Sequence, residues 1–509
     1  MTQPSYEELR AAHRWQLPER LNLGVEAAER APRDAPAILV TDGTKVTRTV
    51  SFGELARDAN RLANALAALG VVPGDRVALL LPQRPETAVA HVALAKLGAI
   101  SVPLSILFGT DALRMRVGDA GVRAVLGERE PLDRLAALGL GVPLIDVDRD
   151  LPGLLAQASD RFEPAPTGPD TPALLVYTSG TTGPPKGALH GHRVLAGHLP
   201  GFELSHDFFP QSGDVIWTPS DWAWIGGLYD VLIPALHHGV PVVAYRGGKF
   251  DPERAFDLIE RLGIRNLFMP ATALRLMRLH DPGAPVSLRT VASGGETVGA
   301  ETATWCRERL GVRLNEFYGQ TEANLLVGNC AAWEAKPGSM GRPYPGHDVR
   351  LVDGEVCVRV EGDPVCFLGY WRNEEATAAK VRDGWLHTGD QAVEDDDGYL
   401  HFLGRDDDVI SSAGYRIGPG EIEECLGKHP AVALAAVVGV PDAERGQVVQ
   451  AFVVLAPGIE PDDGLAAALR QHVRERLAPY EVPRSVAFVE ELPTTVTGKI
   501  RRRQLRSSN

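Results

Sequence analysis

The amino-acid sequence predicts an α/β protein in two parts: a large N-terminal domain of helix-covered sheets with a β-rich subdomain, and a small α+β C-terminal domain. Three observations carry this prediction. Short apolar strands alternate with helices over most of the chain, short strands with Asp-Gly turns follow residue 350, and helix and strand alternate again after the polar run at 404–408. We place the large domain at 1–404, a hinge at 405–408 and the small domain at 409–509.

The first helix and strand show the pattern of the large domain. Apolar residues recur at three- and four-residue steps over 52–69, which predicts an amphipathic helix that Gly70 ends. The apolar run 76–81 then predicts a buried strand. The same order recurs further along the chain, at 86–97 followed by 99–103 and at 252–262 followed by 266–269. Short strands between helices of this length predict parallel sheets.

The elements expected after residue 350 follow a different pattern. The strands expected at 349–352, 355–360 and 399–403 are associated with Asp-Gly turns, which predict antiparallel hairpins. The last hundred residues form a compact unit of their own, with elements expected at 421–428, 433–440, 451–455, 464–477 and 485–489. A unit of that size can hold its own core.

Composition excludes several classes of function. The 52 basic and 66 acidic side chains leave a formal charge of −14, which argues against nucleic acid as the main partner. The longest apolar stretch, 89–108, is interrupted by polar residues, and the N-terminus lacks an apolar signal core. The five cysteines form no C-x-x-C pair, as is usual in a reducing compartment. We expect a soluble cytoplasmic protein that binds neither nucleic acid nor membrane.

The sharpest local signal is Tyr177-Thr-Ser-Gly-Thr-Thr-Gly-Pro-Pro-Lys-Gly187, which follows an expected strand at 173–177. Glycines let backbone N–H groups approach phosphate oxygens, hydroxyls donate further hydrogen bonds, and Lys186 supplies a point charge. It is not the P-loop of kinases and GTPases, because Gly187 follows the lysine where that pattern needs serine or threonine. The segment predicts a phosphate-binding loop.

The loop resembles that of the adenylate-forming (AMP-binding) superfamily, which includes acyl-CoA synthetases, luciferases and peptide-synthetase adenylation domains. Segments that match in the superfamily's order span essentially the whole chain, namely Gly294-Gly-Glu296, Tyr318-Gly-Gln-Thr-Glu322, Gly369-Tyr-Trp371, Trp385-Leu-His-Thr-Gly-Asp390, Gly404-Arg-Asp-Asp-Asp408, Gly414-Tyr-Arg-Ile-Gly418 and Pro493-Thr-Thr-Val-Thr-Gly-Lys499. Each is weak alone, whereas the ordered set is specific. The segments 415–423 and 478–484 look most like those of medium-chain and aryl acyl-CoA synthetases.

The resemblance implies an ATP site. The β- and γ-phosphates would be wrapped by Thr178, Ser179, Gly180, Thr181, Thr182, Gly183 and Lys186. Adenine would be bound along Gly295, Glu296, Thr297, Tyr318, Gly319 and Gln320, with Tyr318 stacked on the base. Asp390 and Arg405 would hold the two ribose hydroxyls. Thr321 would donate to the α-phosphate or the substrate carboxylate, and Glu322 would hold Mg²⁺, since a hard cation prefers carboxylate oxygen.

The resemblance also assigns Lys499 as the adenylation lysine. A carboxylate that attacks the α-phosphate needs both negative charges screened, and a flexible ammonium can bridge them. Pro493 and Gly498-Lys499 fit the frame in which related enzymes are silenced by lysine acetylation, so a lysine acetyltransferase and a deacetylase are possible partners.

The small domain is expected to move about Asp407. In the superfamily, rotation at this position withdraws the lysine after adenylation and brings in the face that carries Gly414, which completes a tunnel for CoA. Arg416 would contact substrate or phosphate in the first state. Candidate CoA contacts are Ala413, Gly414, Tyr415, Arg445, Arg474 and Arg484.

The acyl pocket is expected to be lined by Trp224, Ile225, Gly226, Gly294 and Gly319. Acetate- and propionate-specific relatives carry a tryptophan where this chain has Gly319, so we expect a longer acid, medium-chain, short branched or aryl. Trp222 and Trp224 either stack an aryl ring or simply close the pocket.

The expected activity is that of an ATP-dependent acid–CoA ligase, with ATP, CoA and a carboxylic acid as substrates and Mg²⁺ as cofactor. Three other readings stay open: an adenylation protein that loads a carrier protein, a non-catalytic adenylate sensor, and a luciferase-like oxygenase. The sequence does not indicate the natural acid or the oligomeric state.

Overall fold

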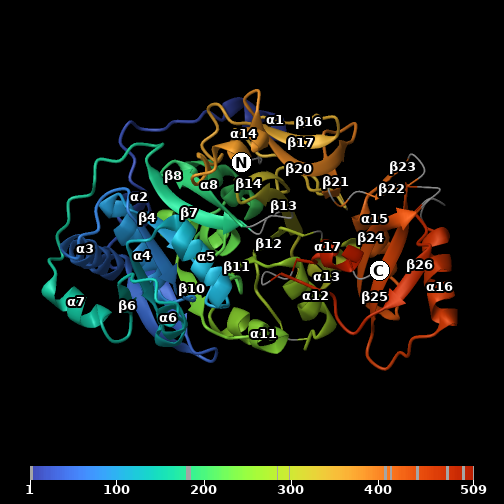
Figure 1. Ribbon diagram of the computed structural model, residues 1–509, viewed down its shortest axis with the longest axis horizontal. Helices are drawn as coiled ribbons and strands as arrows, with labels where there is room; N and C mark the ends of the chain where they lie inside the picture. The colour runs from blue at the N-terminus through green and yellow to red at the C-terminus, as the bar shows by residue number, and fades with distance from the viewer. Residues whose placement is uncertain are drawn as a thin grey trace.

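The computed structural model has a large body and a smaller one at the C-terminal end (Figure 1). It describes residues 4–178, 185–283, 285–296, 298–336, 338–405, 408, 410–412, 415–442, 446–476, 481–495 and 499–507. Within these residues the strands form four sheets. None of the described helices is long and apolar enough to cross a membrane.

One large sheet comes mostly from the N-terminal third of the chain. Its strands are β3 (Arg76–Leu80), β4 (Ile100–Pro103), β5 (Ala124–Gly127), β6 (Leu144–Asp146), β7 (Pro172–Thr178), β8 (Lys186–Gly191) and β18 (Gly369–Tyr370). Their order is β18-β8-β7-β4-β3-β5-β6 among the described strands. The pairs from β7 to β6 are parallel, and β8 and β18 add antiparallel strands at one edge.

The second large sheet combines the start of the chain with its middle. Its strands are β1 (Pro36–Thr41), β2 (Val46–Ser51), β9 (Ile216–Trp217), β10 (Val242–Tyr245), β11 (Asn266–Phe268), β12 (Thr290–Gly294), β13 (Leu314–Gln320), β14 (Ala323–Gly328) and β15 (Arg342–Pro343). Their described order is β15-β14-β13-β12-β11-β9-β10-β1-β2, parallel from β13 to β1 and antiparallel at both edges. β1 therefore pairs with a strand far along the chain, with Ile38 opposite Val242.

Helices cover these sheets and fill the space between them. They are α1 (Tyr6–Ala12), α2 (Leu23–Ala28), α3 (Phe52–Ala68), α4 (Pro85–Leu97), α5 (Thr110–Ala120), α6 (Arg129–Ala136), α7 (Leu151–Gln157), α8 (Val194–Ser205), α9 (Ile225–Gly227), the π-helix η1 (Leu228–Leu232), α10 (Ile233–His237), α11 (Pro252–Arg261), α12 (Ala271–Leu279), α13 (Ala300–Arg309) and α14 (Glu374–Lys380).

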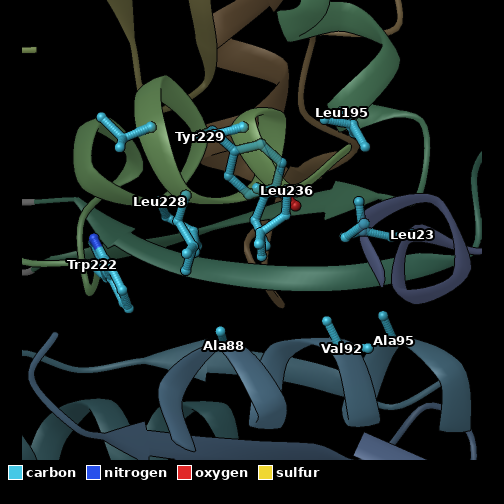
Figure 2. Packing of buried hydrophobic residues seen from close by; sticks show 14 of the residues in the cluster. Leu23, Ala88, Val92, Ala95, Leu195, Trp222, Leu228, Tyr229 and Leu236 are labelled. Carbon is cyan, nitrogen blue, oxygen red and sulfur yellow. The ribbon is translucent and has the colours of Figure 1, made fainter. Parts of the chain in front are cut away.

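The largest core cluster joins the two sheets. It contains Val77 and Leu174 from one sheet and Ile38 and Val242 from the other. Nearly every residue of α4 is buried, as expected for a helix that is apolar all round and packed on every side. Figure 2 shows Ala88, Val92 and Ala95 of α4 turned toward Leu228, Tyr229 and Leu236 across the core.

A smaller antiparallel sheet forms the β-rich subdomain. Its strands are β16 (Val349–Val352), β17 (Glu355–Arg359), β19 (Val381–Arg382), β20 (Trp385–Glu394) and β21 (Leu400–Arg405). Two of its turns need positive φ at both central residues, with Asp353 at 51° and Gly354 at 81°, and Asp383 at 52° and Gly384 at 79°. Asp-Gly supplies that conformation, which matches the twist of a two-residue hairpin. The predicted hairpins are confirmed.

The C-terminal body has its own sheet and core. Its elements are β22 (Ile410–Ser412), β23 (Tyr415–Ile417), α15 (Pro419–Gly427), β24 (Val432–Asp442), β25 (Gly446–Leu455), α16 (Asp463–Arg474), β26 (Ser485–Phe488) and α17 (Arg502–Ser507). Apolar residues of α15, α16 and the long β24–β25 hairpin form a separate buried cluster. This body sits at one end of the molecule in Figure 1.

The predicted fold class is confirmed. The elements expected from periodicity are present with ends that shift by a few residues; for example, α3 spans Phe52–Ala68 and α11 spans Pro252–Arg261. The five cysteines are buried and form no disulfide among the described residues.

Candidate active site

The expected phosphate loop connects two paired strands. β7 ends at Thr178 and β8 begins at Lys186, and these residues lie opposite each other. The Thr178 hydroxyl donates to the Lys186 carbonyl oxygen at 3.4 Å. Residues 179–184, which include the predicted Ser179, Gly180, Thr181, Thr182 and Gly183, lie outside the described residues. The end of β7 and the start of β8 therefore show where this loop begins and ends, near one edge of the first large sheet.

Tyr370 links the loop lysine to the expected magnesium ligand. It belongs to β18, which pairs with β8, and the Lys186 ammonium lies 5.4 Å from the centre of its ring. Its hydroxyl donates a short hydrogen bond to the Glu322 carboxylate. Burial, together with this carboxylate, raises the pKa of the Tyr370 phenol, so the ring stays neutral and keeps its donor. Lys186 thereby lies over the ring of Tyr370, and Glu322 lies at its hydroxyl.

Asp390 is the centre of the expected ribose site. Its Oδ2 accepts hydrogen bonds from the Tyr318 hydroxyl at 2.6 Å and from the Gln320 amide at 2.5 Å. Arg405 lies directly opposite on β21, with its guanidinium 3.4 Å from the Asp390 Oδ1. Burial beside this carboxylate raises the pKa of the Tyr318 phenol well above its ordinary range. Four residues predicted to bind nucleotide are thus in direct contact.

A second row of residues holds this group in place. The Lys380 ammonium donates to the Gln320 side-chain oxygen at 3.0 Å and to the Thr388 carbonyl at 2.9 Å. The Glu355 carboxylate accepts from the Gly389 N–H at 2.7 Å and contacts His387 Nδ1 at 2.8 Å. These contacts fix both the Gln320 amide and the backbone next to Asp390.

Lys499 reaches the large body. A Cβ built on Gly295 would lie 3.9 Å from Lys499 Cε, so the lysine passes directly over the Gly-Gly-Glu segment that follows β12. Thr495 holds the lysine's own backbone, because its N–H donates to the Lys499 carbonyl at 2.7 Å and its hydroxyl accepts from the Lys499 N–H at 3.1 Å. Gly295 has φ of +85°, a conformation that a side chain would strain. The two bodies are therefore arranged with Lys499 beside the Gly294-Gly-Glu296 segment of the large body.

The remaining predicted nucleotide residues lie nearby or are not described. Glu296 follows Gly295 and accepts from the Thr272 hydroxyl at 3.3 Å. Thr321 lies in the turn between β13 and β14, beside Glu322. Thr297 lies outside the described residues, as does the hinge residue Asp407.

Glu316 is a half-buried acid that the sequence did not single out. It lies on β13, and its carboxylate accepts from the Val298 N–H at 3.2 Å. Burial raises its pKa from 4.5 to about 7, and the negative charge of Glu424 from the smaller body adds to the shift. The folded protein therefore binds this proton more tightly than the unfolded chain does.

We expect Glu316→Gln to stabilise the protein at pH 8. Because the folded-state pKa is raised, the charged carboxylate opposes folding increasingly as pH rises from 4.5 to about 7, and the amide removes this cost. Because the pKa moves from 4.5 to about 7, the gain should be roughly 1–3 kcal/mol, at about 1.4 kcal/mol per pKa unit, and should nearly vanish at pH 4.5. Urea unfolding midpoints at the two pH values measure it. Glu308→Gln, an exposed neighbour on α13, is the control. An equal gain at both pH values would contradict the assignment.

The expected acyl-pocket glycines have close neighbours. A Cβ on Gly294 would come within 2.4 Å of the Phe317 ring, and one on Gly319 within 2.5 Å of the Leu325 nitrogen. Gly226 would meet the Phe268 ring at 3.1 Å. Glycine is thus required for close packing at two of these positions, so the size of the pocket does not follow from the missing side chains alone.

Trp222 and Trp224 differ in their packing and exposure. Trp224, which with Ile225 and Gly226 was expected to line the pocket, packs edge-on against Phe108 with ring centres 5.6 Å apart. Trp222 is completely buried in the core (Figure 2). Trp224 therefore stays a candidate for contact with the acid, whereas Trp222 is not exposed to one.

The structure describes only part of the expected CoA site. Ala413, Gly414 and Arg445 lie outside the described residues, and Tyr415 and Arg416 are described only as backbone of β23. Arg474 is exposed at the end of α16, and Arg484 is exposed just before β26. No contact joins these two arginines to the nucleotide residues among the described pairs.

Sequence reasoning missed three residues of the site. Tyr370 belongs to the Gly369-Tyr-Trp371 motif, but no role was assigned to it. The motif was the sequence signal that could have identified this residue. Lys380 and Glu355 belong to no recognised motif. The pairing of β17, β19 and β20 brings them close to Asp390.

Comparisons with known proteins give matches over most of the chain. A family model described as AMP-binding enzyme matches residues 25–371, and one described as AMP-binding enzyme C-terminal domain matches residues 421–499. The chain is 35% identical to an acyl-coenzyme A synthetase of Rattus norvegicus (ACSM4, mitochondrial), over 92% of this chain and 86% of that protein. It is 34% identical to 4-hydroxybutyrate–CoA ligase 1 of Metallosphaera sedula, over 90% of this chain and 84% of that protein.

A solved structure extends the likeness to three dimensions. The anthranilate CoA ligase AuaEII in complex with anthranoyl-AMP superimposes with a TM-score of 0.88 at 28% identity, covering 97% of this chain and 98% of that one. Both bodies are therefore shared with that structure.

Proposed function

Because the chain belongs to the AMP-binding enzyme family and is an ATP-dependent acid–CoA ligase, we propose that its large body binds ATP and the acid while its small body supplies first Lys499 and then the CoA tunnel. The enzyme activates a carboxylic acid as acyl-AMP with release of pyrophosphate, then transfers the acyl group to CoA with release of AMP. The closeness of Lys499 to Gly295 supports the proposal, because a Cβ built on Gly295 would lie 3.9 Å from Lys499 Cε, beside the segment proposed to bind adenine.

We assign the nucleotide contacts from the geometry. Asp390 and Arg405 face each other across two strands, so together they can hold the 2′- and 3′-hydroxyls of ribose. Tyr318, half-buried and neutral, presents its ring to the adenine and its hydroxyl to Asp390. Lys186 and the loop that precedes it bind the β- and γ-phosphates.

Glu322 is the proposed ligand of Mg²⁺. Glu322 is 7% exposed, and its carboxylate accepts from the Tyr370 hydroxyl, near Lys186. A single protein carboxylate fits this ion, which keeps several waters and takes its other ligands from substrate phosphates. The ion would neutralise phosphate charge, and Thr321 would donate to the α-phosphate or the acid carboxylate.

Lys499 has the task of screening charge in the first half-reaction. The acid carboxylate and the α-phosphate are both negative, so their approach is opposed until a cation lies between them. An ammonium on a flexible stem can bridge the two groups, and the closeness of the Lys499 side chain to Gly295 supports this role.

The second half-reaction needs a different arrangement of the two bodies. We propose that the division lies at 405–408, that rotation occurs at Asp407, and that it replaces Lys499 with the face that carries Gly414. Arg416 would contact phosphate before the rotation. Tyr415, Arg445, Arg474 and Arg484, together with Ala413, are proposed to contact CoA afterwards.

The first test is turnover of a panel of acids by the pure protein. Pyrophosphate and AMP release would be measured with Mg-ATP and acids from acetate to decanoate, isobutyrate and benzoate, each with and without CoA. We expect CoA-dependent release of AMP that peaks above three carbons. Pyrophosphate release that CoA does not accelerate would contradict the ligase and indicate a carrier-protein partner. Absence of release with every acid would indicate a sensor.

We further propose that acetylation of Lys499 switches the enzyme off. Acetylation removes the charge to which adenylation is assigned. Lys499 is exposed in the structure, so a modifying enzyme can reach it. Treatment with a bacterial-type protein acetyltransferase should abolish acyl-AMP formation, and a deacetylase should restore it. Full activity of the modified protein would contradict the proposal.

A further inference from the structure

Three side chains of the kinds that bind metal ions meet in the β-rich subdomain. Cys357 of β17 lies directly opposite His387 of β20, and Glu355 lies two residues before Cys357 on the same strand. Opposite residues of paired strands, and residues two apart on one strand, share a face of the sheet. A thiol, an imidazole and a carboxylate are therefore gathered on one face. The chemistry proposed above assigns none of the three to a substrate or to Mg²⁺.

The three side chains converge on the imidazole nitrogen His387 Nδ1. It lies 3.4 Å from Cys357 Sγ and 2.8 Å from Glu355 Oε2. One ligand atom from each side chain lies within 4.8 Å of the other two, and no second group of this kind occurs among the described residues. In a tetrahedral zinc site, neighbouring ligand atoms are about 3.3–3.6 Å apart. The thiol and imidazole already fit, and opening the imidazole–carboxylate contact by about half an ångström makes room for the ion.

Burial gives this group an inner and an outer side. Cys357 is completely buried, whereas the His387 and Glu355 side chains are 15% and 17% exposed. An ion can therefore enter past the carboxylate and the imidazole and meet the thiol inside.

The protonation of the three side chains suits a divalent ion. Burial raises the pKa of the Cys357 thiol to about 11, so the free thiol keeps its proton. A metal deprotonates a thiol that coordinates it, and the proton passes to solvent. A neutral His387 binds through Nδ1 and keeps its single proton on Nε2. The thiolate and the Glu355 carboxylate then supply two negative charges to a doubly positive ion.

The positive side chains nearby leave room for the ion. The Arg382 guanidinium lies 3.6 Å from Glu355 Oε2, but its side chain is 55% exposed and can turn toward water. Arg350 packs over the Trp385 ring, and the Lys380 ammonium donates to two oxygens of other residues. Together these three charges favour the thiolate over the thiol, although burial outweighs them.

We propose that Glu355, Cys357 and His387 bind a thiophilic divalent ion of the zinc class, with water as a fourth ligand. Sulfur and imidazole ligands select zinc, whereas Mg²⁺ prefers oxygen ligands alone. This site is therefore distinct from Glu322, the proposed ligand of Mg²⁺. Because Glu355 also accepts from the Gly389 N–H at 2.7 Å, a bound ion would brace the backbone beside Asp390.

The alternative is that the three side chains only bond to one another. A hydrogen-bonded group of this kind keeps its thiol proton, so the state of the sulfur separates the two roles. Co²⁺ reports on that state, because a thiolate bound to it gives an intense charge-transfer absorption in the near ultraviolet. Carboxylate and imidazole groups on the surface give no such absorption.

The test uses the full chain without a histidine tag, freed of metal by a chelator and titrated with Co²⁺ and then with Zn²⁺. We expect one Co²⁺ per chain with the thiolate absorption, and its displacement by one Zn²⁺ but not by a large excess of Mg²⁺. Lack of binding, binding without the thiolate absorption, or displacement by Mg²⁺ would overturn the inference. The measurement needs no substrate, so its outcome is independent of the proposed ligase activity.

Variants locate the site. Cys357→Ser should abolish the thiolate absorption and weaken Zn²⁺ binding by at least about 100-fold, because even a residue that only orients a ligand contributes about 10–100-fold. His387→Gln should also weaken Zn²⁺ binding, and it provides a second test if Cys357→Ser does not fold. Cys366→Ser is the control, since Cys366 is another buried cysteine of this subdomain and should leave both readouts unchanged. A thiolate absorption that survives in Cys357→Ser, or Zn²⁺ affinity unchanged in His387→Gln, would overturn the inference.

Discussion

Lys499→Ala should lose acyl-adenylate formation by about a hundred- to a thousandfold while it keeps most of the conversion of supplied acyl-AMP to thioester. The Lys499 side chain passes close to Gly295, near which the acid and the α-phosphate are expected to meet, and alanine leaves their repulsion unscreened. In the second half-reaction the acyl group is already activated, so this charge has no further task. ATP–pyrophosphate exchange measures the first step, and thioester formation from synthetic acyl-AMP and CoA measures the second.

The control is Arg501→Ala. Arg501 is exposed on the same basic tail, two residues after Lys499. Its replacement by alanine therefore removes one positive charge without reaching the proposed nucleotide site. It should leave both half-reactions near wild-type rates. Equal loss of both half-reactions in Lys499→Ala would show that the lysine supports the fold of the small body rather than the chemistry.

Asp390→Ala should raise the KM for ATP by roughly a hundred- to a thousandfold. A hydrogen bond to a charged group contributes about 1.5–3 kcal/mol, and the carboxylate is expected to bind ribose while it also holds Tyr318 and Gln320. Loss of about 3–4 kcal/mol corresponds to the stated factor. The KM for the acid at saturating ATP should change far less, because no described contact of Asp390 is with an expected acyl-pocket side chain. Steady-state kinetics with each substrate varied in turn separate the two.

Asp390→Asn and Asp396→Ala are the comparisons. The asparagine keeps one oxygen for Tyr318, so its KM for ATP should lie between those of wild type and Asp390→Ala. Asp396 is an exposed aspartate in the turn after the same strand, and its removal should leave both KM values unchanged. A rise in the KM for the acid as large as that for ATP would mean that Asp390 organises the whole domain.

The sequence predicted the fold well where periodicity and turn chemistry are local. The helix at α3, the parallel strands β3 and β4, and the Asp-Gly hairpins at 353–354 and 383–384 follow from spacing and from the conformations that Asp-Gly allows. Family resemblance then identified Tyr318, Gln320, Asp390 and Arg405, which the structure brings into contact. These are short-range signals or fixed motifs.

The residues that could not be predicted depend on pairing between distant segments. Lys380 reaches Gln320 across 60 positions, and Asp230 meets Asn324 across 94. No spacing rule relates such positions, because their contact depends on how separate elements pack. The interpretation of Gly319 as open pocket space failed to foresee such packing, because the backbone of Asn324 and Leu325 occupies that space.

The parallel pairing of β1 with β10 has a consequence for how the enzyme is made. Ile38 faces Val242, so when the first strand leaves the ribosome its partner is still about 200 residues away. At a synthesis rate of roughly 5–20 residues per second, the apolar edge of β1 remains without its partner strand β10 for on the order of 10–40 s. During that time the β1–β2 hairpin is an unpaired edge of Ile38, Leu39 and Val40, open to pairing with other nascent chains. The yield of active enzyme in a cell should therefore depend on translation speed and on chaperones that cover this edge, even though the finished sheet leaves it fully paired.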